Sequence, residues 1–136
     1  MSQQTRDEQA IKTLLEDWAT AVRRHDLPAI LAHHDPEMVM FDLPPPLQCK
    51  GIAAYEETWG LLFQYHQLGT AFDIQEATVT AGSDLAFVVA IMWCGPGAST
   101  NPKEKDGFPF RLTVGLRKVD GQWRITHEHH SVPATD

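Results

Sequence analysis

The chain has 136 residues, which suits one domain with a substantial apolar core, and its formal net charge of −7 argues against nucleic acid or an anionic membrane as the partner. Its polar start shows no signal-peptide pattern, and its longest apolar run is far too short to cross a bilayer. We therefore expect a cytoplasmic protein with one domain over residues 1–136, in which the two cysteines are free thiols.

The first predicted elements are two helices. Thr5 and Glu8 have the spacing of a capping box, and apolar residues then recur at helical spacing as far as Val22. A second, shorter helix is expected with Asp26 as its N-cap and Pro28 in its first turn. The apolar stripe of the first helix is expected to face the core.

A short strand is predicted over residues 38–41, and it ends at Asp42. The prolines at 44–46 cannot continue a hydrogen-bonded ladder, so they force an extended loop. A third helix is expected over about residues 51–65, with its large apolar side chains directed inward.

In the second half of the chain the apolar residues change from helical spacing to alternation. Strands are predicted at 72–80, 85–94, 110–119 and 122–131, with a loop over 95–107 and a hairpin turn at Asp120-Gly121. Helices followed by antiparallel strands indicate an α+β fold, in which a helix across a curved sheet leaves a cone-shaped cavity. Residues 85–94 are apolar on both faces, so we expect one face to cover the cavity and the other to form a symmetric homodimer.

The last predicted strand contains the most informative polar residues. His127, Glu128, His129 and His130 stand where an ordinary strand would continue to bury apolar side chains. Imidazoles beside a carboxylate can bind an anion, bind a metal or move a proton near neutral pH. The tail therefore indicates a functional site.

The order of these elements and motifs resembles the SnoaL-like group of the nuclear transport factor 2-like superfamily, which includes ketosteroid isomerase. The resemblance covers almost the whole chain and is carried by AVRRHDL at 21–27, MFD at 40–42, KG at 50–51, GSDLA at 82–86, RLT at 111–113 and DGQWRI at 120–125 running into HEHHS at 127–131. It implies a cone formed by a curved antiparallel sheet and three N-terminal helices. Because the superfamily includes isomerases, cyclases, dehydratases, ligand binders and assembly domains, the fold does not settle the function.

The resemblance to ketosteroid isomerase implies a role for Asp42, which falls where those enzymes keep their general-base aspartate. Their oxyanion-hole tyrosine aligns with Trp18, and their protonated aspartate aligns near Val114, so one of three functional positions is kept. Since a dienolate needs hydrogen-bond donors at its developing oxyanion, the resemblance does not extend to the steroid reaction itself.

Asp42 is the first candidate catalytic residue, as a base or as the acceptor for a ligand hydroxyl. The alternative is a carboxylate at a strand end that accepts backbone N–H groups of the proline loop. The aromatic side chains expected to line a ligand pocket around it are those of Trp18, Tyr55, Trp59 and Phe63.

The direction of the tail histidines depends on the register of the hairpin. With a type I′ turn, Val114 faces His127, and His127 and His129 continue the apolar face of the strand; with a bulge in the turn, Arg111 shares a face with both histidines. We favour a group of Arg111, His127 and His129 near the pocket mouth, with His129 catalytic and His130 as the rival ligand-binding histidine.

A metal site is the alternative use of His127 and His129, with Asp42 or His66 as a third ligand, because catalytic zinc needs three protein ligands. The sequence has no Cys-x-x-Cys and no helical His-Glu-x-x-His pattern. We therefore expect neither a metal nor another cofactor.

Three functions remain open from the sequence. The first is a cofactor-independent isomerase or lyase that acts on a small carbonyl compound, with Asp42 as the base and Arg111 or His129 stabilising the enolate. The second is a non-catalytic binder that holds a small carboxylate through Arg111 and imidazolium groups. The third is a homo-oligomerisation module with a vestigial pocket.

Overall fold

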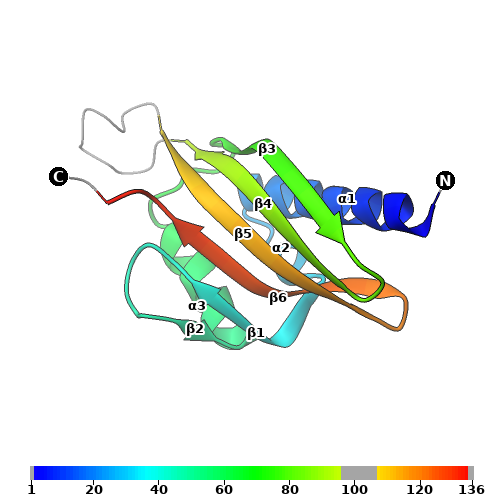
Figure 1. Ribbon diagram of the computed structural model, residues 1–136. Helices are drawn as coiled ribbons and strands as arrows, with labels where there is room; N and C mark the ends of the chain where they lie inside the picture. Colours follow the sequence, from blue (N-terminus) through cyan, green and yellow to red (C-terminus); the bar gives the residue numbers. More distant parts are fainter. Residues whose placement is uncertain (1, 96–106, 135–136) are drawn as a thin grey trace.

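The computed structural model describes residues 2–95 and 107–134, so most of the predicted loop over 95–107 lies outside the described residues (Figure 1). The elements in chain order are α1 (Gln3–Arg23), α2 (Leu27–Leu31), β1 (His34–Phe41), β2 (Cys49–Lys50), α3 (Ile52–Leu62), β3 (Phe72–Ala81), β4 (Leu85–Cys94), β5 (Phe108–Val119) and β6 (Gln122–Ser131). No helix in these two stretches is both long enough and apolar enough to cross a membrane.

The strands form a six-stranded sheet in the order β2-β1-β6-β5-β4-β3. Neighbouring strands are antiparallel except for β1 and β6, which are parallel and lie far apart in the sequence. The sheet is curved and open, and Figure 1 shows the helices on one side of it. The predicted α+β fold is confirmed, and the parallel β1–β6 pair is its one departure from a purely antiparallel sheet.

Helix α1 begins earlier than the capping-box pattern predicted. Ser2, not Thr5, is the N-cap, and its side chain accepts the backbone N–H of Thr5 at 3.1 Å. The predicted apolar stripe is buried, with Ile11 and Val22 fully enclosed, and α1 packs along β3. The helix therefore lies across the sheet as expected, and α3 packs against β1 and β2.

Strand β1 also begins earlier than predicted. It starts at His34 and pairs with β6 through an irregular stretch between His34 and Val39, which accommodates the proline in this segment. The early start places His34 beside Ile125 of β6. His34 therefore lies in the core, with 6% of its surface exposed.

Strand β4 has one covered and one open face in the single chain. Its inward side chains, such as Val88, are buried, whereas Leu85, Phe87 and Val89 are 58%, 49% and 53% exposed. An exposed apolar row of this kind is typical of an interaction surface. The predicted homodimer through this face stays a prediction.

The turn between β5 and β6 is of type I′, because Asp120 and Gly121 both have positive φ angles, of 52° and 79°. Lys118 therefore faces Trp123, as the first of the two predicted registers requires. The register does not continue unchanged along the strands.

A β-bulge at Thr126 changes the face on which every later side chain of β6 lies. Ile125 pairs with Leu116 and His127 pairs with Gly115, so Thr126 has no partner of its own. Its hydroxyl donates to the Gly115 carbonyl oxygen at 3.2 Å. After the bulge, the even-numbered residues point into the core.

Candidate functional site

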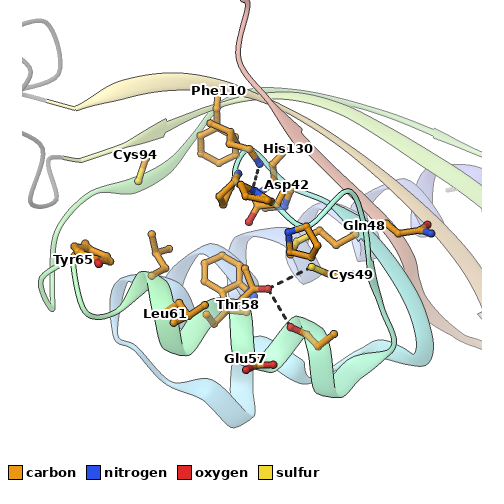
Figure 2. A pocket seen from close by; sticks show the side chains of 18 of the residues that line it. Asp42, Gln48, Cys49, Glu57, Thr58, Leu61, Tyr65, Cys94, Phe110 and His130 are labelled. Atoms are coloured by element: carbon orange, nitrogen blue, oxygen red, sulfur yellow. Dashed lines mark hydrogen bonds and ion pairs between the residues drawn. The ribbon is translucent and has the colours of Figure 1, made fainter.

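A pocket of about 690 Å³ lies between α3, the loop after β1 and the ends of β4 and β5. Most of its wall is apolar, formed by residues that include Met40, Trp59, Leu61, Leu62, Phe72, Cys94, Phe108 and Phe110. Figure 2 shows Asp42, His130 and Phe110 together on one side, opposite Glu57, Thr58 and Leu61 of α3. The volume and wall suit a small organic ligand. We call the side with Asp42 and His130 the polar end.

Asp42 directly follows β1, and its side chain is 17% exposed at the polar end. Its Oδ1 atom accepts the backbone N–H of Leu43 at 2.8 Å. The same oxygen lies 4.0 Å from Nδ1 of His130 (Figure 2). The carboxylate thus accepts a backbone N–H, as the alternative for Asp42 expected, and it also lines the pocket; its role as a base stays a prediction.

His130 reaches the pocket from β6 and is 7% exposed. Its ring stacks on Phe110 with a centroid distance of 5.5 Å and an interplanar angle of 16°, and its Nε2 atom lies 2.8 Å from Oε1 of Glu128. The edges of Trp18 and Trp59 complete the enclosure of the ring. The imidazole is therefore fixed on its Nε2 side and faces Asp42 with Nδ1.

Glu128 is the centre of a buried group behind the polar end, which we call the Glu128 cluster: Trp18, His34, Tyr55, Glu128 and His130. Glu128 is 1% exposed, and its Oε2 atom accepts the Tyr55 hydroxyl at 2.7 Å and lies 2.5 Å from Nε2 of His34. Burial opposes ionisation of this carboxyl, but hydrogen bonds from His130 and His34 outweigh it and lower its pKa to about 2. Glu128 is therefore a carboxylate at neutral pH.

Tyr55 connects the cluster to α1. Its hydroxyl oxygen accepts the indole N–H of Trp18 at 3.0 Å while its proton goes to Glu128. Burial and the neighbouring Glu128 charge raise the pKa of Tyr55 well above its ordinary value, so it stays a neutral donor. Among the described residues, Trp59 is the one whose buried side-chain N–H has no hydrogen-bond partner.

The structure brings together some of the predicted site residues. Asp42, Trp59 and His130 line the pocket. Trp18 and Tyr55 lie behind it in the Glu128 cluster. Phe63 is absent from the pocket wall and stacks on His25, with 3.9 Å between the ring centroids.

The predicted grouping of Arg111, His127 and His129 near the pocket mouth is wrong. The three do share a face, but the bulge at Thr126 makes it the outer face of the sheet. Arg111 is exposed and donates from Nε to Ser131 at 3.1 Å. His129 is exposed and His127 half-buried, and both rings lie against Phe41. His130, the rival, is the tail histidine that lines the pocket.

The residues proposed for a metal site are not together either. His127 and His129 lie on the outer face, Asp42 lies at the pocket, and His66 contacts His25 with 3.0 Å between ring nitrogens. Across residues 2–95 and 107–134, no group of three or more His, Cys, Asp or Glu side chains is arranged to hold a metal ion.

Sequence reasoning missed two members of the cluster. The sequence marked Glu128 only as a neighbour of the tail histidines, and no pattern in it marked His34. One signal was present: Glu128 and His130 are two residues apart on a strand, so they must share a face. The residue that contacts Glu128 from β1, His34, could not be identified without knowing that β1 pairs with β6.

The comparisons with known proteins agree on one fold. The SnoaL-like domain family matches residues 11–135. A nuclear transport factor 2-like protein of unknown function from Pseudomonas putida KT2440 is 37% identical, with a TM-score of 0.86 over 96% of this chain and 89% of that chain. No curated protein gives a significant match.

Two more distant structures are similar in fold alone. A ketosteroid isomerase-like protein from Erwinia carotovora atroseptica SCRI1043 is 21% identical, with a TM-score of 0.72 over 94% of this chain and 98% of that chain. A putative calcium/calmodulin dependent protein kinase II association domain from Xanthomonas campestris is 17% identical, with a TM-score of 0.70 over 92% of this chain and 87% of that chain. These neighbours differ in their described roles, so the site itself must indicate the function.

Proposed function

The chain belongs to the SnoaL-like domain family, and on that basis we propose that it binds a small, mainly apolar carbonyl compound and moves a proton on it without a cofactor. The observation that carries the proposal is the pair of Asp42 and His130 at the polar end of an otherwise largely apolar pocket. An acid and a base at one end of such a pocket fit an isomerase or lyase.

In the proposed step, the Asp42 carboxylate takes a proton from the carbon next to the ligand carbonyl. The electron pair of the broken C–H bond forms the C=C bond of an enol, and His130 donates the Nδ1 proton to the carbonyl oxygen. Return of the Asp42 proton to a different carbon, while His130 recovers its own, gives an isomer. Loss of a group from the β-carbon instead gives a lyase product.

The charges around the pocket favour a neutral ligand over the small carboxylate considered from the sequence. Asp42 and Glu57 are acidic, and among the lining residues that the structure describes Lys50 is the one lysine or arginine. Arg111, the expected carboxylate partner, lies on the opposite face of the sheet. A ligand carboxylate at the polar end would therefore meet the Asp42 carboxylate, with His130 but no arginine beside it.

Assembly through the outer face is a second proposed property, supported by the exposed row of Leu85, Phe87 and Val89 on β4. A symmetric homodimer would cover this row. Because the pocket lies on the side of the sheet that carries α3, the homodimer is compatible with ligand binding.

The test is a thermal-shift screen that pairs neutral ketones with carboxylates of matched size, followed by NMR detection of deuterium exchange into any ketone that binds in D₂O. We expect ketones to raise the melting temperature, and Asp42→Asn to abolish exchange while the ligand still binds. Asp84→Asn, on the exposed β3–β4 turn, is the matched control and should exchange normally. Binding of carboxylates alone, or unchanged exchange in Asp42→Asn, would contradict the proposal.

A further inference from the structure

Four titratable side chains form a continuous row from the pocket into the core: Asp42, His130, Glu128 and His34. The separations along the row are 4.0 Å from Asp42 Oδ1 to His130 Nδ1, 2.8 Å from His130 Nε2 to Glu128 Oε1, and 2.5 Å from Glu128 Oε2 to His34 Nε2. Carboxylates and imidazoles alternate in it. The charge of each member therefore depends on where the protons of its neighbours lie.

The hydrogen-bond partners of His34 determine which of its ring nitrogens carry a proton. Its Nε2 atom faces the Glu128 carboxylate, and its Nδ1 atom lies 3.3 Å from the carbonyl oxygen of Ala32. Both neighbours are acceptors, so both ring nitrogens must carry a proton. The side chain of His34 is fully buried, and Glu128 provides the opposite charge that such a buried imidazolium needs.

The partners of His130 likewise determine that Nε2 carries a proton, but they do not determine the state of Nδ1. Nε2 faces the Glu128 carboxylate and must be protonated. Nδ1 is too far from Asp42 for a direct hydrogen bond and faces the pocket end, so its proton can leave and return.

We propose that the buried pair of Glu128 and His34 fixes the Nε2–H tautomer of His130, so that Nδ1 is the atom that exchanges a proton with the ligand. This inference rests on the proposed function and deepens it. Glu128 and His34 are positioning residues, since neither lines the pocket. With Asp42 and Glu128 ionised and both imidazoles protonated, the row is electrically neutral, which lowers the cost of burying it.

The surroundings of the row support this arrangement of protons. The other titratable groups near it are Tyr55, which is a neutral donor to Glu128, and Cys94 in the pocket wall, where burial raises the thiol pKa to about 11 and keeps it protonated. Four more titratable residues line the pocket, Cys49, Lys50, Glu57 and Tyr65, and Figure 2 shows Glu57 across it from His130. Phe110, Trp18 and Trp59 enclose the His130 ring without offering it a proton acceptor.

The role of Glu128 differs from that of a proton carrier. When His130 gives its Nδ1 proton to the ligand oxygen, the ring becomes neutral and keeps its Nε2 proton on Glu128. The N–H bond at Nδ1 breaks, its electron pair stays on nitrogen, and no proton crosses Glu128. A buried carboxylate with a pKa of about 2 is suited to this fixed role, because it does not accept the proton itself.

The experiment is two-dimensional NMR of the ¹⁵N-labelled ligand-free full chain, which correlates ring nitrogens with ring carbon-bound protons and so reports which nitrogens are protonated. His34→Gln, His130→Gln and the outward-facing neighbour His129→Gln assign the signals. At neutral pH we expect both nitrogens of His34 to be protonated and Nε2 of His130 to be protonated. A bare Nε2 on His130, or a neutral His34, would overturn the proposal.

Glu128→Gln tests the cause. An amide has one accepting oxygen and one donating NH₂ group, so it cannot receive both imidazole N–H groups. We expect loss of the Nε2 proton from either His34 or His130, whereas Asp7→Asn, at a buried carboxylate elsewhere, should leave both in place. Retention of both Nε2 protons in folded Glu128→Gln would overturn the assignment, and if this variant does not fold the native spectrum still decides. Because no ligand is used, the outcome is separate from the ketone screen.

Discussion

The protein buries two carboxylates in two different ways. Asp7, near the start of α1, is 5% exposed and belongs to what we call the Asp7 cluster: Gln3, Asp7, Lys118 and Trp123. Lys118 Nζ lies 2.9 Å from Asp7, and the indole N–H of Trp123 donates to it at 3.1 Å. Glu128 is more deeply enclosed, at 1% exposed, and its partners are two imidazoles and a phenol.

The partners distinguish a structural site from a chemical one. Lysine is charged over the whole physiological pH range, so the Asp7 cluster has one protonation state and ties α1 to the β5–β6 hairpin. Histidine changes charge near neutral pH, and the Glu128 cluster connects through His130 to a pocket. Burial and a lowered pKa alone do not identify a catalytic group, since both carboxylates have them.

The largest expected effect is on stability when each carboxylate loses its charge. Glu128→Gln should lower the free energy of unfolding by about 3 kcal/mol, because two buried imidazoles lose their common partner. Asp7→Asn should cost about 1 kcal/mol, since Lys118 is partly exposed and can turn to water. Urea denaturation at pH 7 measures both. Equal losses would show that the two clusters are energetically alike.

The second effect is on the pH dependence of stability. The pKa of Glu128 lies near 2 in the folded chain against an ordinary value of 4.5, so its contribution is complete above pH 4.5 and is lost as the pH falls toward 2. Asp7, whose pKa is lowered mainly by the hydrogen bond from Lys118, contributes with the same sign. We expect Glu128→Gln to remove more of the acid-dependent loss of unfolding free energy than Asp7→Asn, measured by denaturation from pH 6 to pH 2. A larger effect of Asp7→Asn than of Glu128→Gln would contradict this expectation.

A third and smaller effect concerns one neutral donor from each cluster. Tyr55→Phe removes a buried donor from Glu128 and leaves the Trp18 N–H without a partner, so it should cost about 2 kcal/mol. Gln3→Ala removes a donor from Asp7 at the exposed start of α1 and should cost about 0.5 kcal/mol or less. Thermal unfolding of the two variants compares them. A larger loss of stability in Gln3→Ala than in Tyr55→Phe would contradict this order.

The smallest expected effect comes from salt. Lys118 is partly exposed, whereas His34 is fully buried, so added ions should screen the Asp7 pair more than the Glu128 pair. The stability difference between the native chain and Asp7→Asn should shrink by a few tenths of a kcal/mol from 0.1 M to about 1 M NaCl, and the difference for Glu128→Gln should stay constant. Equal salt dependence of the two differences would contradict this distinction.

Local patterns in the sequence predicted much of the fold. The apolar stripe of α1, the cap at Asp26 and the hairpin turn at Asp120-Gly121 each depend on residues close together in the chain, and the structure confirms them. The position of Asp42 at the end of β1 also followed from such a pattern. These features are encoded by the spacing of neighbouring residues.

The Glu128 cluster could not be predicted in this way. His34 and Glu128 are 94 residues apart, and they meet because β1 and β6 pair in parallel through an irregular register. Which of His129 and His130 enters the pocket depends on Thr126, a residue that no propensity marks as a bulge. Pairings between distant strands depend on the whole core, so they are not visible in the alternation of one strand.

The unpaired Thr126 is a residue that the ladder between β5 and β6 can lose without a change of face in the rest of β6. Deleting it would leave a regular strand in which His127 still faces Gly115 and Glu128 still faces Val114, so Glu128 and His130 would keep their inward direction. A lineage with this architecture can therefore lose the bulge through a single in-frame deletion and keep its interior groups.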